Sequence, residues 1–349
     1  MTDVEGSPTK HALLAPGCRR WLLAYSDSLF RHPPGIVRSD PSEVSYVRGI
    51  RHWIGWLTAM MLLIGLSACT AGPQSAATPP VPGSSDTMVP QPNGKKVSVV
   101  PRPDHIVVVI FENEHRSSVI GSPQAPYLNK LAARGANLTH SYGITHPSQP
   151  NYLALFSGST QGVTSNTCPQ QFPNADNLGH QLRTAGLSFA GYAESLPTVG
   201  YTGCGSGDYR RKHNPWVDFT NLPASVNRPF STFSRDYRKL PTVSFVSPNM
   251  CHSMHDCSIG TGDQWMQQHL DAYARWATGH NSWLIVTFDE NAGGTVNPIP
   301  TIIIGDHVRP GRSAEKIDHY GLLRTVEDAY RLPALGRAAA VSPLSTIWK

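Results

Sequence analysis

The stretch His105-Ile-Val-Val-Val-Ile-Phe111 is a continuous run of apolar, mostly β-branched residues, and it ends in the polar pair Glu112-Asn113. An unbroken apolar run of this length is typical of a strand that is buried on both faces, because a half-exposed strand would alternate polar and apolar residues. The stretch therefore predicts one strand of a sheet that is covered on both sides.

The chain after this stretch alternates between apolar strands and helices. Further strands are expected at residues 187–193, 242–246, 283–288 and 301–304, and helices at 126–134, 148–156, 178–185, 263–278 and 319–330. This order predicts an α/β fold, with a mostly parallel central sheet between layers of helices. Ligands of such sheets bind beyond the carboxyl ends of the strands. At those ends this chain has Glu112-Asn113, Asn249 and Asp289-Glu290.

Four regions follow from composition. Residues 47–69 combine a basic flank, an apolar run over 53–66 and the lipobox-like Leu66-Ser-Ala-Cys69, which predicts a lipoprotein signal peptide with Cys69 as the lipidated residue. An ordinary signal peptide and an uncleaved anchor are the alternatives. Residues 1–46 are an N-terminal extension or sequence upstream of the true start at Val47. Residues 70–103 form a Pro/Ser/Thr-rich tether, and residues 104–349 form the catalytic domain.

The bulk numbers place further bounds on function. The 349 residues are 40% hydrophobic and 15% charged, which suits a packed core. The net charge of +5 is too small to indicate nucleic-acid binding. Oligomeric state stays open. The predicted location is outside the cytoplasm: the exported chain is lipid-anchored to the outer face of the bacterial cell membrane or secreted.

Four cysteines follow the signal region. An even number in an exported chain favours disulfides, here Cys251 with Cys257 and Cys168 with Cys204. The alternative is a zinc site made of Cys251, His252, His255 and Cys257.

The segment Thr145-His-Pro-Ser-Gln-Pro-Asn-Tyr152 leads into a short apolar helix that ends at Gly158. Proline is tolerated in the first turn of a helix, so Ser148 or Thr145 is expected at or just before a helix N-terminus. Unpaired N–H groups and the positive dipole end favour anions there and an ionised nucleophile. The alternative is that the hydroxyl only caps the helix.

Together these polar groups match the needs of phosphoryl transfer. Carboxylates and an amide suit a divalent metal ion, imidazoles suit proton transfer, and a hydroxyl beside the metal is a workable nucleophile. The candidates are Glu112, Asn113, His146, Ser148, His252, His255, Asp256, Asp289, Glu290 and His319.

Five motifs carry a family resemblance: Phe111-Glu-Asn113, residues 145–158, Met254-His-Asp256, Thr287-Phe-Asp-Glu290 and His319-Tyr-Gly-Leu-Leu-Arg-Thr-Val-Glu327. In this order they resemble the phosphoesterase family of acid phosphatases and bacterial phospholipases C, within the alkaline phosphatase superfamily. The likeness is greatest to secreted mycobacterial acid phosphatases and runs from about residue 104 to Trp348. It implies an alkaline-phosphatase-like α/β/α sandwich and hydrolysis of phosphate monoesters through a phosphoenzyme.

The resemblance also implies residue roles. Glu112, Asn113, Asp289 and Glu290 match metal-binding positions of the family, and His255, Asp256 and His319 match positions around the phosphoryl group. Related phosphodiesterases have Thr-x-Pro-Asn with a glycine ten residues after the threonine. Ser148 fits this register better than Thr145 does, and His146 is an adjacent base. Ser253 stands where mycobacterial members have an aspartate, which puts a second metal ion in doubt.

The resulting expectation is an extracytoplasmic acid phosphatase that forms a phosphoserine with the help of a divalent metal ion of open identity. Its substrate is a phosphomonoester, either a small molecule or a phosphoinositide. Phospholipase C or another phosphodiesterase activity is the alternative within the class. A non-catalytic binding lipoprotein on the same fold is the alternative outside it.

Overall fold

The computed structural model describes residues 100–349. The predicted signal peptide with its predicted lipidation site Cys69, residues 1–46 and nearly all of the predicted tether lie outside this range. Within it, no helix combines the length and the apolar character that a membrane crossing would need.

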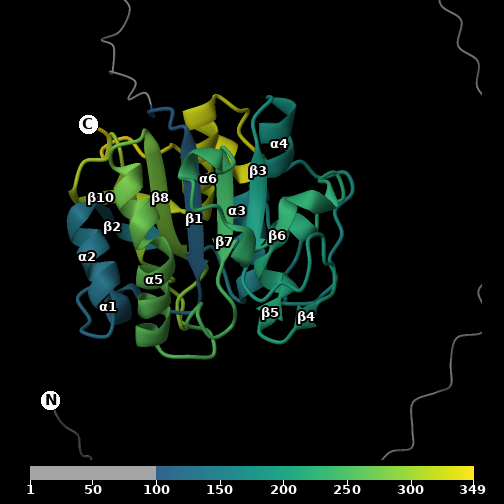
Figure 1. The fold of residues 1–349 in the computed structure, drawn as a ribbon, viewed down its shortest axis with the longest axis horizontal. Helices are drawn as coiled ribbons and strands as arrows, with labels where there is room; N and C mark the ends of the chain where they lie inside the picture. Colours follow the sequence, from purple (N-terminus) through teal and green to yellow (C-terminus); the bar gives the residue numbers. More distant parts are fainter. Residues whose placement is uncertain (1–99) are drawn as a thin grey trace, which may run out of the picture. The chain divides into compact units, whose positions relative to one another are not determined.

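An eight-stranded sheet forms the centre of the described domain, in the order β10-β2-β9-β8-β1-β7-β3-β6 (Figure 1). Seven strands run in one direction, and β9 runs antiparallel to its neighbours β8 and β2. The strands are β1 (His105–Phe111), β2 (Ala136–Tyr142), β3 (Phe189–Ala193), β6 (Asn227–Pro229), β7 (Val243–Ser247), β8 (Ser282–Phe288), β9 (Thr301–Gly305) and β10 (Gly311–Asp318). A separate hairpin pairs β4 (Gly205–Ser206) with β5 (Tyr209–Arg210).

Helices cover both faces of this sheet. On one side lie α2 (Pro126–Arg134) and α5 (Ile259–Ala277), and on the other lie α3 (Ser148–Ser157), α4 (Leu178–Thr184) and α6 (His319–Tyr330). Strand β1 feeds both cores, because Val107 and Val109 face the first set while Ile106 and Val108 face the second. The remaining helices are short: α1 (Arg116–Val119), η1 (Arg211–His213), η2 (Pro215–Val217), η3 (Ala224–Val226), η4 (Phe230–Thr232), η5 (Tyr237–Lys239) and η6 (Gly336–Ala340).

The predicted α/β fold with a mostly parallel central sheet is confirmed, and several elements have the expected bounds. The expectations for β1, α2 and α6 match residue for residue. Helix α5 begins four residues earlier than expected, because the Ser258 side chain caps it by accepting a hydrogen bond from the Thr261 N–H. Strands β2 and β10 were not predicted, because their polar side chains break the apolar pattern.

The sheet brings the polar strand ends together. Glu112 and Asn113 follow β1, and Asp289 and Glu290 follow its parallel neighbour β8. The Asp289 N–H donates to the Phe111 carbonyl at 2.9 Å, so the two acidic pairs stay side by side just beyond the ladder. This edge of the sheet carries the candidate site.

Candidate active site

Ser148 is the first residue of α3, and a buried asparagine holds the segment that leads to it. Asn151 Oδ1 accepts hydrogen bonds from the backbone N–H groups of Ile144 and Thr145, at 2.8 and 3.1 Å. Its Nδ2 donates to the Thr145 carbonyl at 2.8 Å. The loop conformation is therefore fixed by one side chain, and Ser148 is presented at a defined place.

The Ser148 hydroxyl lies between two carboxylates. Its Oγ is 2.9 Å from Glu112 Oε2 and 3.0 Å from Glu290 Oε1. Glu290 Oε2 in turn lies 2.5 Å from His146 Nδ1. The serine is only 2% exposed, so it is a nucleophile candidate with acceptors on two sides rather than a solvent-facing cap.

Glu112, Asp289 and Glu290 are all buried, and Glu112 and Glu290 contact this hydroxyl. Burial is the main cause that raises the pKa of each carboxyl. The pKa of Asp289 is raised well above its usual value, because the charges of Glu112 and Glu290 add to burial. Asp289 Oδ1 accepts from the Asn113 N–H at 3.2 Å, whereas its buried Oδ2 has no hydrogen-bond partner. The donor set of carboxylates and an amide is the one that a hard divalent cation needs.

His213 is a site residue that the sequence interpretation missed. Its Nε2 lies 3.0 Å from Glu112 Oε1, without the alignment of a hydrogen bond. The ring stacks on Tyr152 with centroids 5.2 Å apart, and the Tyr152 hydroxyl donates to the same Glu112 oxygen. Burial, with the neighbouring charge of Lys212, lowers the pKa of His213 well below its usual value. The imidazole is therefore neutral at ordinary pH and free to act as a ligand.

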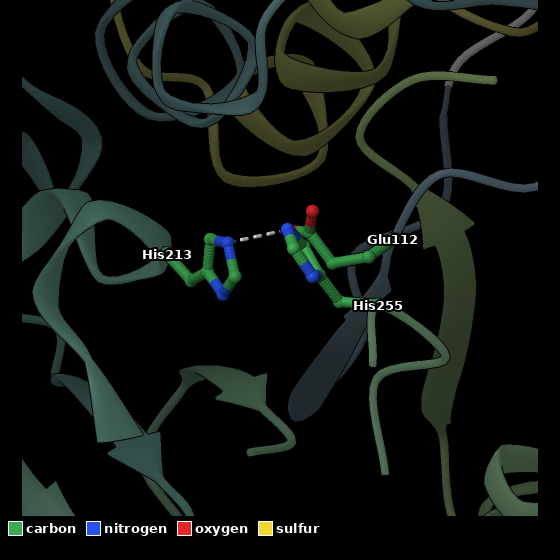
Figure 2. A group of neighbouring side chains, drawn as sticks. All are labelled: Glu112, His213 and His255. Carbon is green, nitrogen blue, oxygen red and sulfur yellow. Dashed lines mark ion pairs between the residues drawn. The ribbon is translucent and has the colours of Figure 1, made fainter. Parts of the chain in front are cut away.

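His255 belongs to a second donor set, which shares Glu112 with the first. Ligand atoms of Glu112, His213 and His255 all lie within 4.8 Å of one another, so this trio is also able to hold a metal ion (Figure 2). His255 Nδ1 is 2.7 Å from Asp256 Oδ1, and its Nε2 is 3.3 Å from Lys212 Nζ. Asp256 itself is exposed and reaches the site only through His255.

The loop that carries His255 is held by covalent and backbone contacts. Cys251 pairs with Cys257, and Cys168 pairs with Cys204, which confirms both predicted disulfides. The alternative zinc site is wrong, because its two thiolates are joined to each other. His252 contacts Glu194 at 2.9 Å instead of a metal position. The Glu112 N–H donates to the Ser253 carbonyl, which fastens the loop to the end of β1.

Like His252 and Asp256, two further sequence candidates lie outside the immediate surroundings of the Ser148 hydroxyl. Thr145 Oγ1 donates to the neighbouring His146 carbonyl at 3.2 Å. His319 is buried, and its Nε2 lies 2.6 Å from the Asp289 backbone carbonyl. This contact holds the Asp289 backbone in place. Burial lowers the pKa of this imidazole, which therefore donates to the carbonyl in its neutral form.

Comparisons with known proteins identify the family. Residues 121–333 match the model of the phosphoesterase family. The chain is 49% identical over 257 residues to the phosphatidylinositol-3-phosphatase of Mycobacterium tuberculosis, covering 73% of this chain and 86% of that protein. It is 31% identical to a probable acid phosphatase of Kluyveromyces lactis, covering 66% of this chain and 59% of the yeast protein.

Among solved structures, an alkaline phosphatase superfamily protein from Vibrio parahaemolyticus aligns with a TM-score of 0.49 and 14% identity, over 70% of this chain and 71% of that one. The family match and the mycobacterial relative carry the assignment, and the relatives' names support a phosphatase activity. This chain belongs to the phosphoesterase family.

Proposed function

We propose that the protein is an extracytoplasmic acid phosphatase that hydrolyses phosphate monoesters through a phosphoserine at Ser148. One observation carries the proposal: the buried Ser148 hydroxyl lies within hydrogen-bond distance of both Glu112 and Glu290, at the N-terminus of α3. A helix N-terminus attracts the phosphoryl group, and adjacent carboxylates with raised pKa values accept a proton at acid pH.

The donor set fits a divalent metal ion. Asp289 Oδ2 and His213 Nε2 are both buried and lack hydrogen-bond partners, and both belong to the shell around Glu112. The family resemblance assigns the ion to Glu112, Asn113, Asp289 and Glu290. Among the described residues, the acidic and imidazole ligand atoms that lie within 4.8 Å of one another are those of Glu112, His213 and His255, which offer a second set. When bound, such an ion supplies Lewis-acid stabilisation of negative charge and lowers the pKa of a neighbouring hydroxyl.

In the first step Ser148 Oγ attacks phosphorus while its proton passes to the Glu290–His146 pair. The bond between phosphorus and the ester oxygen breaks, and the leaving oxygen takes a proton from His255, which Asp256 orients through Nδ1. Lys212 lies beside His255 and adds positive charge near the transferred group. Water then attacks the phosphoserine and gives a proton to His255, the bond between Oγ and phosphorus breaks, and Ser148 regains its proton from the Glu290–His146 pair as phosphate leaves.

The substrate proposed is a phosphomonoester, and a phosphoinositide is included because the mycobacterial relative is a phosphatidylinositol-3-phosphatase. The lipobox-like sequence at Cys69 supports export and attachment to the outer face of the cell membrane. The two disulfides support the same location, since such bonds persist in oxidising compartments.

Hydrolysis assays on the full chain test the proposal. We expect release of p-nitrophenol from p-nitrophenyl phosphate, little release from bis(p-nitrophenyl) phosphate, and loss of activity in a chelator that added divalent metal reverses. Ser148→Ala should lower kcat by at least about a thousandfold, equivalent to roughly 4 kcal/mol of barrier. Preference for the diester would make the protein a phosphodiesterase, and hydrolysis of neither substrate would favour a binding lipoprotein.

A further inference from the structure

Asn297 is a buried asparagine in the loop between β8 and β9, and no step of the mechanism above uses it. Its side chain bridges two segments of the chain. Its Oδ1 accepts a hydrogen bond from the Asn291 N–H at 2.7 Å, and its Nδ2 donates to the Thr145 carbonyl, 152 residues away, at 3.0 Å. An amide satisfies both partners, whereas a carboxylate or an apolar side chain does not.

The partners of this bridge are the peptide groups next to the proton-accepting pair. The Asn291 N–H belongs to the peptide group that joins Glu290 to Asn291, and the Thr145 carbonyl belongs to the one that joins Thr145 to His146. Glu290 Oε2 and His146 Nδ1 lie 2.5 Å apart. The amide of Asn297 therefore connects the two backbones from which this pair extends.

The loop that carries Asn297 is held in shape by a second asparagine. Asn291 Oδ1 accepts from the Gly293 N–H at 2.8 Å, and its Nδ2 donates to the Val296 carbonyl at 2.9 Å. Asn291 is 1% exposed and Asn297 is 8% exposed. Hydrogen bonds in a low-dielectric interior are stronger than those in water, so the bridge is a rigid connection.

The two segments stay attached when the Asn297 side chain is changed. The Gly143 N–H donates to the backbone carbonyl of Asn297 at 2.9 Å. The Thr145 carbonyl also accepts from Asn151 Nδ2 at 2.8 Å, so it keeps a partner. Gly143 leaves room for the amide, because a Cβ there would come within 2.5 Å of Asn297 Nδ2. Replacement of Asn297 should therefore alter the geometry of the site more than the fold.

We propose that Asn297 is a positioning residue that sets the separation of Glu290 and His146. Glu290 Oε1 lies 3.0 Å from Ser148 Oγ, so the same separation sets the place of the carboxylate that takes the serine proton. The inference rests on the proposed function, since that function gives the pair its role in proton transfer. Asn297 acts only through the pair, and a small error in the place of a proton acceptor slows the chemical step.

Steady-state hydrolysis of p-nitrophenyl phosphate by the full chain tests this role. Asn297→Leu removes both the donor and the acceptor at similar side-chain volume. Its kcat should fall at least about thirtyfold with KM changed less than about threefold, because proton transfer belongs to the chemical step and not to substrate binding. In a His146→Ala background the same substitution should cost less than about threefold, because the pair through which it acts is already broken.

Asn177→Leu is the matched control. Asn177 is fully buried at the N-cap of α4, where its Oδ1 accepts from the His180 N–H and its Nδ2 donates to Asn221 Oδ1. This variant should lose stability to urea as Asn297→Leu does, yet keep kcat within about twofold, because it removes a helix cap away from the pair. Elemental analysis is the second control: Asn297→Leu should keep at least about half of the bound metal, since the amide holds backbone groups and is no ligand.

The crystal structure of Asn297→Leu gives a result that does not depend on activity. The contact between His146 Nδ1 and Glu290 Oε2 should open beyond about 3.5 Å, the limit of a hydrogen bond. A contact of wild-type length would overturn the inference, and so would metal loss that parallels the loss of kcat. Equal costs of Asn297→Leu with and without His146 would show that Asn297 only stabilises the fold. An open contact in the variant of a protein without phosphatase activity would refute the proposed function alone.

Discussion

At the scale of single residues, Glu112 has the most contacts in the site. Its two carboxylate oxygens contact Ser148, Tyr152, Asn113 and His213. Two different donor sets therefore meet at one residue, one made of carboxylates and an amide and the other of imidazoles. Asp289 has a free buried oxygen in the first set, and His255 is the more exposed imidazole of the second.

This difference leads to a prediction about the metal. Asp289→Asn removes a charged ligand with an unpartnered oxygen, so bound divalent metal per chain should fall at least about tenfold. His255→Ala should keep at least about half of the metal while lowering kcat, because its proposed role is proton transfer. Elemental analysis of the purified variants measures both. Metal loss in His255→Ala with retention in Asp289→Asn would move the ion to the imidazole set.

The carboxylates and the amide of the site were predicted from the sequence, whereas His213 and Lys212 were not. Glu112, Asn113, Asp289 and Glu290 directly follow apolar strands, so the rule for parallel sheets brings them together. His213 and Lys212 lie in a long segment between β3 and β7 that has no regular period. Their place depends on tertiary contacts, such as the hydrogen bond from Ser247 Oγ to the His213 carbonyl, and no local pattern encodes these.

At the scale of elements, the loop from Cys251 to Cys257 positions His255. Closing so short a loop stabilises the fold by roughly 2 kcal/mol in the chain-entropy model, and closing the Cys168–Cys204 loop by roughly 4 kcal/mol. The short loop should therefore matter more for catalysis than for stability.

We predict that a Cys251→Ser, Cys257→Ser double variant loses at least about tenfold in kcat while it stays folded at 25 °C, because the bridge orients a proton donor. Circular dichroism and urea denaturation check the fold beside the kinetic assay. The matched control is Cys168→Ser, Cys204→Ser, which should lower stability more and kcat less. Unchanged kcat in the first variant would mean that the Glu112–Ser253 backbone contact holds the loop without the bridge.

Helix α6 contains a buried carboxyl that makes stability depend on pH. Glu327 accepts a hydrogen bond from the Leu335 N–H at 2.8 Å, but its Oε2 has no hydrogen-bond partner. Burial raises the pKa of Glu327 from 4.5 to about 7. The folded state thus holds a proton that the unfolded chain has already released. The free energy of unfolding therefore decreases as pH rises from about 4.5 to 7, because the buried Glu327 carboxyl resists ionisation.

Glu327→Gln keeps an acceptor for the Leu335 N–H and removes the titration. The variant should match the wild-type free energy of unfolding near pH 4.5 and exceed it by roughly 3 kcal/mol at pH 8. Urea denaturation at the two pH values measures this difference, in which other titrating groups cancel. A pH-independent difference would show that Glu327 is ionised in the folded protein.

The elements themselves were predictable where one physical signal dominated. The uniform apolar run predicted β1, and Pro126 with Gly135 marked the ends of α2. Helix α6 begins where the Asp318 side chain accepts a hydrogen bond from the Gly321 N–H. Strands β2 and β10 were not predicted, because polar and apolar side chains follow one another in them without a regular period. They are strands because each pairs with the other and β2 also pairs with β9, and pairing of this kind is a property of the whole sheet.

At the scale of the whole molecule, the basic flank, apolar run and Leu66-Ser-Ala-Cys69 predict attachment of the chain to a membrane by lipid. Wild-type protein should partition with membranes, and mass spectrometry should find a mature N-terminus at an acylated Cys69. Cys69→Ala should block cleavage there. A mature N-terminus at another residue without lipid would contradict the anchoring and leave the catalytic domain unaffected.

The central claim is that Ser148 becomes covalently phosphorylated, and acid quenching during turnover tests it most directly. Protein mixed with p-nitrophenyl phosphate and quenched within one turnover should yield phosphate on the peptide that contains Ser148, as identified by tandem mass spectrometry. Ser148→Ala should yield none, because its side chain has no hydroxyl to attack phosphorus. Phosphate on Thr145, or turnover without any trapped phosphate in wild-type protein, would contradict the account.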